Sequence, residues 1–189
     1  MSAGKLLILC APSGGGKSTM AKRLMAEFPQ IRFSISATTR SPRPGEEHGR
    51  EYFFLSREEF LAKVASGEFL EHEEFYNGTL YGTLREQVDK MLISGYFPLL
   101  DVDVNGGLNV RSMYPDNSLA LFLRPPSLEI LKERLVARGT ESPETIQIRL
   151  DRTEMELSLA DRFDHIIVND DLERAYSELR TLVERHLLN

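Results

Sequence analysis

The fold of this chain is decided by one stretch of sequence, Ala11-Pro12-Ser13-Gly14-Gly15-Gly16-Lys17-Ser18-Thr19. Before it stands the apolar run 6–10, which predicts a buried strand, and after it residues 18–28 predict a helix that ends before Pro29. A glycine-rich segment that ends in Lys-Ser between a strand and a helix is typical of a loop that binds nucleoside-triphosphate phosphates. The alternative is an ordinary glycine-rich turn, which leaves the Lys17-Ser18 pair and both flanking elements unexplained.

The residue types of this loop suit phosphate chemistry. Successive glycines let backbone N–H groups point at phosphate oxygens, and the helix that follows adds partial positive charge at its N-terminus. Lys17 is expected to supply a cation at the β- and γ-phosphates, and the hydroxyl of Ser18 can ligate Mg²⁺. The first loop position is usually glycine and here is Ala11, which fits the loop if it keeps a negative φ.

The composition limits the classes of protein to which the chain can belong. Its 189 residues predict a single domain, and 41% hydrophobic residues can fill a core without disulfides or a structural metal. The net charge of −6 argues against a general binder of nucleic acid or of anionic membranes, so phosphate ligands must be held locally. Cys10 is the one cysteine, which excludes an intrachain disulfide, and the four histidines lack the spacing of a zinc site.

The apolar run near the N-terminus is short. It falls far below the ~18 residues needed to cross a bilayer and is also shorter than the core of a signal peptide. We therefore expect a cytoplasmic protein without a membrane or nucleic-acid partner.

After the loop, short apolar strands alternate with helices. Further strands are expected at residues 32–38, 52–55, 69–75, 80–81, 97–102, 119–123 and 165–168. Helices are expected at residues 56–66, 83–94 and 171–188, and others begin near residues 127 and 142. Capping boxes predict two of these helix starts, Ser56 with Glu59 and Thr83 with Glu86. This alternation indicates an α/β three-layer sandwich, a parallel sheet covered on both faces, with a mixed α+β insertion.

A second anion site is indicated within that insertion. Arg40 and Arg43 lie three residues apart on a loop stiffened by two prolines, so their planar guanidinium groups can converge on one phosphate. The alternative is a solvated loop in which the arginines pair with Glu46 and Glu47.

From residue 38 to residue 54 the chain reads Thr-Thr-Arg-x-x-Arg-x-x-Glu-x-x-Gly-x-x-Tyr-x-Phe. This spacing is similar, without a gap, to the signature of the guanylate kinase family, and the resemblance extends over residues 4–187. Other stretches that look like family positions are Tyr81-Gly82-Thr83, Asp101-Val102-Asp103, Arg138-Gly139-Thr140 and Ile167-Val168-Asn169-Asp170. The resemblance implies a P-loop NTPase fold with residues 36–83 as a GMP-binding insertion and residues 136–158 as a short lid. It also implies the reaction of ATP with GMP or dGMP in the presence of Mg²⁺.

The resemblance further implies roles for particular residues. The GMP phosphate is expected to be held by Arg40, Arg43, Tyr52 and Tyr81. Guanine and its ribose are expected to be surrounded by Ser36, Glu71, Thr83 and Asp103. Arg138 and Arg149 are expected to be lid arginines, and Asn169 is expected to lie near the base of ATP.

Glu71 suits the recognition of guanine on chemical grounds. Guanine presents N1–H and N2–H₂ donors on one edge, and a carboxylate accepts from both, whereas adenine offers no matching pair. The alternative is that Glu71 belongs to a solvated acidic strand, because residues 68–74 include four glutamates.

Transfer between two phosphates requires positive charge rather than a base, because the acceptor phosphate, with a second pKa of about 6, is already largely a dianion. That charge is expected from Mg²⁺ and from Lys17, Arg43, Arg138 and Arg149. Asp101 ends a predicted strand and is either a Walker-B-like acid that approaches Mg²⁺ through water or an aspartate that caps a turn. Arg134 and Arg152 are expected to lie on helix surfaces and pair with glutamates one turn away.

Two other functions stay open. Another small P-loop kinase, such as a ribose-bisphosphate kinase, would not need the guanine-edge set of Ser36, Glu71 and Asp103. A protein-binding module similar to guanylate kinase could keep the GMP site without ATP turnover, and the intact Gly16-Lys17-Ser18 argues against it. We expect small-molecule partners, and both a monomer and a homodimer agree with the sequence.

Overall fold

The structure is a computed structural model that describes residues 5–75, 78–137 and 143–188. Within these residues the central element is a five-stranded sheet of order β2-β7-β1-β8-β9, whose neighbouring strands are all parallel. Its strands are β1 (Leu6–Cys10), β2 (Ile31–Phe33), β7 (Phe97–Asp101), β8 (Ser118–Arg124) and β9 (His165–Val168). The expected parallel core sheet is confirmed.

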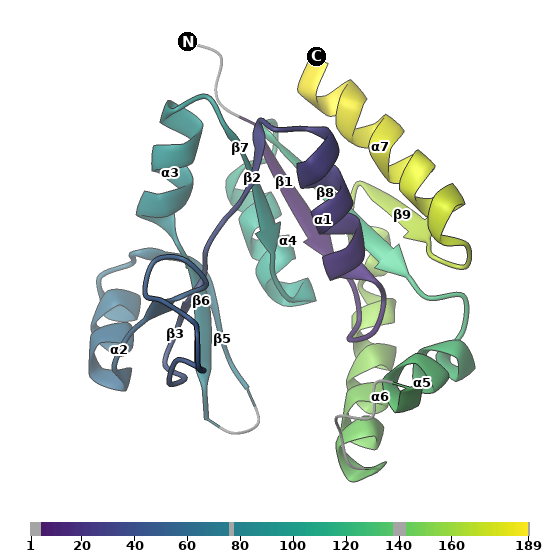
Figure 1. The fold of residues 1–189 in the computed structure, drawn as a ribbon, viewed down its shortest axis with the longest axis horizontal. Coiled ribbons are helices and arrows are strands. Elements are labelled where there is room, and N and C mark those ends of the chain that lie inside the picture. The colour runs from purple at the N-terminus through teal and green to yellow at the C-terminus, as the bar shows by residue number, and fades with distance from the viewer. Residues whose placement is uncertain (1–4, 76–77, 138–142, 189) are drawn as a thin grey trace.

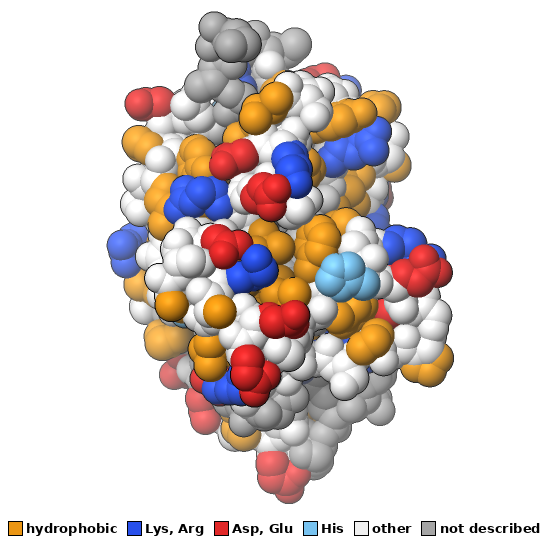
Figure 2. Space-filling view, turned by 90° about the vertical axis from the view of Figure 1, so that its left-hand side faces the viewer, with side chains coloured by type: hydrophobic (Ala, Val, Ile, Leu, Met, Phe, Trp, Pro, Cys, Tyr) orange, Lys and Arg blue, Asp and Glu red, His pale blue; other side chains and the backbone are white. Residues whose placement is uncertain are grey.

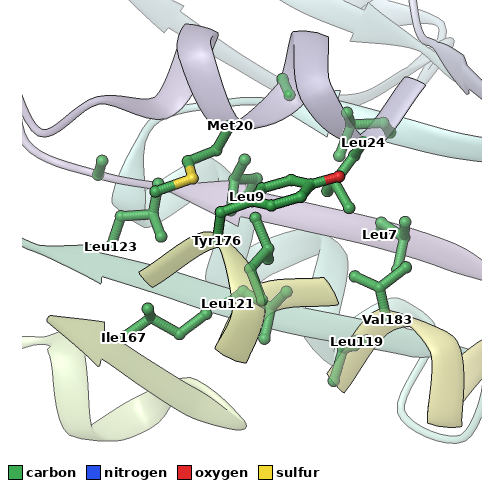
Figure 3. Packing of buried hydrophobic residues seen from close by; sticks show 14 of the residues in the cluster. Leu7, Leu9, Met20, Leu24, Leu119, Leu121, Leu123, Ile167, Tyr176 and Val183 are labelled. Atoms are coloured by element: carbon green, nitrogen blue, oxygen red, sulfur yellow. The ribbon is translucent and has the colours of Figure 1, made fainter. Parts of the chain in front are cut away.

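Helices cover both faces of this sheet (Figure 1). On one face lie α1 (Lys17–Glu27) and α7 (Leu172–Leu188), and on the other lie α3 (Arg85–Ile93) and α4 (Val104–Met113). Helices α5 (Leu128–Ala137) and α6 (Pro143–Ser158) pack on each other beyond the end of the sheet, and a 3₁₀ turn η1 (Ala160–Arg162) follows α6. Successive side chains of a strand point to opposite faces, and β1 shows this in its two sets of partners. Leu7 and Leu9 pack with α1 and α7 (Figure 3), whereas Ile8 and Cys10 pack with α3 and α4. All of β1 is therefore buried.

A second sheet of order β4-β3-β6-β5 lies beside the first. It consists of β3 (Ala37–Thr38), β4 (Phe53–Phe54), β5 (Phe69–Glu74) and β6 (Leu80–Leu84), and it is mixed because only β3 and β4 pair in parallel. Helix α2 (Arg57–Ala65) packs on it through Phe60, whose ring centroid lies 4.4 Å from that of Phe69. In Figure 1 this sheet and α2 lie at the lower left, and α5 and α6 at the lower right.

The two predicted capping boxes have opposite outcomes. At α2 the box is confirmed, because Ser56 Oγ accepts from the Glu59 N–H at 3.1 Å and Glu59 accepts from the Ser56 N–H at 2.8 Å. At α3 it is wrong, because Thr83 is still part of β6 and Leu84 stands at the N-cap without a side-chain cap. The hydroxyl of Thr83 instead donates to Glu71 at 2.6 Å, so a tertiary contact replaces the local one.

The strand expected at residues 32–38 is two strands in different sheets. β2 pairs with β7 in the central sheet, whereas β3 pairs with β4 and β6 in the second sheet. The alternation of apolar and polar residues over 32–38 is compatible with both short strands. It does not indicate with which strand each of them pairs. The chain leaves the central sheet between them, and this places the second sheet next to the loop after β1.

Helix α4 was not indicated by the sequence pattern, because a Gly106-Gly107 pair disfavours a helix. Packing explains both glycines. A Cβ on Gly107 would lie 2.5 Å from Cys10 Sγ, and a Cβ on Gly106 would lie 2.8 Å from Glu71 Oε2. The glycines therefore let the start of α4 approach both β1 and β5, and Asp103 caps this helix by accepting from the Gly106 N–H at 2.7 Å.

The surface carries charges of both signs. On the face shown in Figure 2, acidic and basic side chains alternate, and the described residues there form no continuous basic patch of the kind that binds nucleic acid. No described helix combines the length and the apolar character that a membrane crossing requires.

Candidate active site

A cavity of about 730 Å³ opens where β1 and β7 end. Because β1 pairs with β7 on one side and with β8 on the other, this is the point at which the strand order reverses and at which α/β sheets bind ligands. The expected site residues that line it are residues 11–19 together with Ser36, Tyr52, Glu71, Tyr81, Asp101, Asp103 and Arg149. The structure thus brings most of the expected site into one cavity.

The backbone of the glycine-rich loop depends on its glycines. Gly14 and Gly16 have φ values of 91° and 96°, which side chains other than hydrogen disfavour. Ala11 keeps a negative φ, as do all described residues other than glycine, so the condition on this position is met. A Cβ on Gly15 would lie 2.9 Å from the Ala11 Cβ, so Gly15 makes room for the alanine.

Lys17 is held at the cavity floor by the end of β7. Its Nζ lies 2.5 Å from Asp101 Oδ1 and donates to the Val102 carbonyl at 3.0 Å. Burial alone would lower the pKa of Lys17, but the acidic groups around it, Asp101 foremost, together raise that pKa above its usual value. The lysine is therefore a fixed positive charge. Asp101 was expected either to approach Mg²⁺ or to cap a turn, and neither expectation included its ion pair with Lys17.

Asn169 lies behind the loop. It is buried, and its side-chain Nδ2 donates to the Gly15 carbonyl at 2.8 Å, while its backbone carbonyl accepts from Arg134 at 3.0 Å. No glutamate pairs with Arg134 among the described residues, so the expected pairing is wrong there, and this arginine instead ties α5 to the segment after β9. Asn169 is placed to support the loop backbone, and its amide is engaged there.

One of the two arginines expected in the lid can be located. Arg149 on α6 lines the cavity and donates to Ser13 Oγ of the loop. Arg138 lies outside the described residues. Helix α6 therefore supplies at least one guanidinium group to the phosphate loop.

Arg40 lies beside Tyr52, which lines the cavity together with Tyr81. Its guanidinium group binds both carboxylate oxygens of Glu46, at 2.7 and 2.9 Å, and lies 5.0 Å from the ring centroid of Tyr52. The rings of Tyr52 and Tyr81 are 5.9 Å apart. Glu46 also accepts from the backbone N–H of Arg43 at 2.7 Å, and Arg40 lowers the pKa of Glu46 to about 2. The glutamate pairing considered as an alternative is therefore what the structure shows for Arg40, and Arg43 is exposed.

Glu71 is not part of a solvated face. Along β5 the residues alternate, so that Glu71 and Glu73 line the cavity while His72 and Glu74 are exposed. Burial, and to a smaller extent the charge of Asp103, raises the pKa of Glu71 to about 7, although Thr83 donates to Oε1.

Among the residues that the structure describes, four of the expected site residues do not line the cavity, namely Arg40, Arg43, Thr83 and Asn169.

The cavity also contains residues that the sequence interpretation placed elsewhere. Arg152 pairs with Glu156 on its own helix at 2.8 Å, as expected, but it also reaches Glu73 at 2.5 Å and Asp103 at 3.2 Å. The expectation that Arg152 lies on the helix surface is therefore wrong. The spacing of Arg149 and Arg152, three residues apart on one helix, is the signal that could have placed both in the cavity.

The chemistry of the cavity differs between its two ends. One end has the loop N–H groups, the N-terminus of α1, Lys17 and Arg149, which suit a polyphosphate. The other has carboxylates that suit a ligand with several N–H donors, and it adjoins the cluster of Arg40, Tyr52 and Tyr81.

Comparison with known proteins gives one consistent result. The family model described as guanylate kinase matches residues 3–186. Curated guanylate kinases of Bacteroides fragilis and Salinibacter ruber are each 48% identical, over 97% and 96% of this chain and over 90% and 96% of their own lengths. Among solved structures, a guanylate kinase from Anaplasma phagocytophilum has a TM-score of 0.75 at 30% identity and covers 100% of this chain and 89% of its own.

Proposed function

The chain belongs to the guanylate kinase family, which phosphorylates GMP with ATP, and we propose that one cavity holds the two nucleotides end to end. The observation that supports this arrangement is that Lys17 in the phosphate loop and Glu71 on β5 line the same cavity. We assign residues 36–83 as the GMP-binding insertion and residues 136–158 as the lid.

ATP is bound by the loop. Its backbone N–H groups and the N-terminus of α1 surround the phosphates, and Lys17 lies at the β- and γ-phosphates. Arg149 lies beside Ser13 and adds positive charge to the transferring group, and Arg138 is expected to do the same. Asn169 acts on ATP through the loop backbone that it supports.

The cavity also suits Mg²⁺, which usually keeps several waters and takes one or two protein oxygens besides those of the substrate phosphates. Among the residues lining it, the Ser18 hydroxyl and the Asp101 carboxylate are hard oxygen donors at the phosphate end. These two residues would hold the ion, which neutralises charge on the β- and γ-phosphates when it is bound.

GMP is bound at the opposite end. Glu71 accepts from guanine N1–H and N2–H₂, with Ser36, Thr83 and Asp103 around the base and ribose. The phosphate is bound by Arg40, Arg43, Tyr52 and Tyr81. The guanidinium group of Arg40 now binds the two carboxylate oxygens of Glu46, and the same geometry suits two oxygens of a phosphate. An oxygen of the GMP phosphate attacks the γ-phosphorus of ATP, the bond to the β-phosphate oxygen breaks, and ADP and GDP form without a general base.

The setting of the enzyme follows from its substrates. ATP and GMP are small soluble nucleotides, and the net charge of −6 disfavours nucleic acid and anionic membranes as partners. We infer a cytoplasmic enzyme that works as a monomer or a homodimer.

The acceptor assignment is tested with a panel of phosphate acceptors. With ATP and Mg²⁺, we expect ADP to form with GMP and dGMP, because both carry the guanine that Glu71 reads, and far more slowly with AMP, CMP, UMP and ribose phosphates. A coupled assay that records ADP release measures each rate. A ribose phosphate as the preferred acceptor would assign the enzyme to the other kinase class.

The affinity for GMP should depend on pH. Glu71 must be ionised to accept from both guanine donors. Because its pKa is about 7, the carboxyl group is largely protonated at lower pH and must release its proton when GMP binds. The KM for GMP is therefore expected to rise about tenfold between pH 8 and pH 6, while the KM for ATP changes less. The Glu71→Gln variant keeps only the titration of the GMP phosphate, so an equal pH dependence in parent and variant would contradict the assignment.

A further inference from the structure

Arg152 occupies the junction of three parts of the molecule. It belongs to α6, its side chain is 20% exposed, and it pairs with Glu73 of β5, Asp103 before α4 and Glu156 of its own helix. Its guanidinium carbon lies 5.7 Å from the ring centroid of Phe75, which follows β5. One side chain thus contacts the proposed lid, the GMP-binding insertion and the core.

This cluster is not what stability alone would favour. Arg152 pairs with three carboxylates, and Glu73 Oε2 is buried without a hydrogen-bond partner among the described residues. Burial raises the pKa of both Glu73 and Glu156, which shows that their charges are costly here. Well-packed apolar residues often stabilise a protein at least as well as a buried ion pair, so the charges call for a functional reason.

The position on α6 supplies that reason. Arg149 and Arg152 lie three residues apart, so they project from neighbouring points of one helix face. Arg149 reaches Ser13 at the ATP end, whereas Arg152 reaches Glu73, two residues along β5 from Glu71. The same helix face therefore contacts both ends of the cavity.

We propose that Arg152 is a positioning residue of the acceptor site, whose ion pair with Glu73 holds β5 and its guanine reader Glu71 against helix α6. This rests on the proposed function, because it assumes that GMP is the acceptor. Arg152 also offsets the charge of Glu73 and Asp103 at the end of the cavity that receives the GMP dianion. Its loss therefore weakens GMP binding and leaves ATP binding at the loop largely unchanged.

The test measures KM for each nucleotide, kcat and the calorimetric Kd of GMP for the parent and for variants of this pair. Arg152→Met should raise the KM and Kd of GMP on the order of tenfold and leave the KM of ATP within about twofold. Arg152→Lys keeps the charge and should restore part of the affinity. Adding Glu73→Gln to Arg152→Met should also restore affinity, because it removes the carboxylate left without its cation.

A matched control comes from the same strand. Arg57 pairs with Glu74, next to Glu73, at 3.0 Å, but both side chains are about half exposed, at 47% and 51%. Arg57→Met should leave both KM values unchanged. If Arg152→Met does not fold, Arg152→Lys and Glu73→Gln carry the test, with KM for GMP expected to rise several-fold in each.

The outcomes separate the two proposals. A parent that phosphorylates GMP, with variants whose GMP affinity is unchanged, would overturn the role of Arg152. So would equal losses for GMP and ATP accompanied by a lower Tm, since these indicate structural damage. A parent that phosphorylates another acceptor instead of GMP would overturn the proposed function itself.

Discussion

Replacing Lys17 with alanine is expected to lower kcat by roughly 10²- to 10⁴-fold, equivalent to about 3 to 5 kcal/mol of transition-state stabilisation. The ammonium group lies at the N-terminus of α1 and is fixed by Asp101 at 2.5 Å and by the Val102 carbonyl at 3.0 Å. Its charge is therefore oriented before the substrate arrives, and no other described side chain of the loop is positively charged. GMP binding should change little, because its contacts lie at the other end of the cavity. Steady-state kinetics with a calorimetric Kd for GMP measure both quantities.

Lys22 provides the control for this variant. It lies on the exposed side of the same helix, so Lys22→Ala removes an equal charge without touching the cavity and should leave kcat unchanged. Equal activity of Lys17→Ala and parent would end the assignment of this loop to ATP.

Base selectivity is the second large effect, and it depends on Glu71. A largely buried carboxylate that accepts two guanine donors is left unpaired by AMP, and sites of this kind reject the wrong partner by roughly 10⁴-fold. GMP should exceed AMP in kcat/KM by that margin. In Glu71→Gln the hydroxyl of Thr83 keeps the amide oxygen at Oε1, so the amide NH₂ replaces the other acceptor. GMP activity and the GMP/AMP ratio should then fall together, because an NH₂ group repels guanine donors but suits an adenine ring nitrogen.

The neighbouring glutamates serve as controls, with one exception that the structure introduces. Glu68 and Glu74 are exposed and pair with Lys63 and Arg57, so glutamine at either position should leave selectivity unchanged. Glu73 lines the cavity and is not a control. An unchanged GMP/AMP ratio in Glu71→Gln would show that another group reads the base.

Local signals were sufficient for much of the fold. The strand, loop and helix over residues 6–28 were predictable because backbone hydrogen bonds, glycine φ angles and apolar periodicity all act within a few residues. The same holds for the capping box at Ser56 and for the parallel core sheet, since βαβ units leave a regular alternation in the sequence. The candidate GMP residues were predicted from the spacing of a motif that resembles a known family. The types of these residues alone would not have assigned them to GMP.

Tertiary packing decided the contacts between distant segments. Thr83 looked like a helix cap and became the partner of Glu71, because β6 continues past it and pairs with β5. The Gly106-Gly107 pair looked unsuited to a helix, yet only glycine lets α4 approach Cys10 and Glu71 closely. In both cases a local preference was outweighed by contacts with another element.

Arg152 shows most clearly why the sequence alone does not predict such contacts. Its partner one turn away, Glu156, was predictable from the sequence, but its bonds to Asp103 and Glu73 join residues 49 and 79 positions apart. No periodicity or spacing encodes such a pair, because it exists only when α6, β5 and the segment before α4 converge on the cavity. The sequence by itself therefore determined that the chain binds phosphates on a parallel α/β sheet. The packing of that sheet against a second one decided which charged groups face the ligand and which face water.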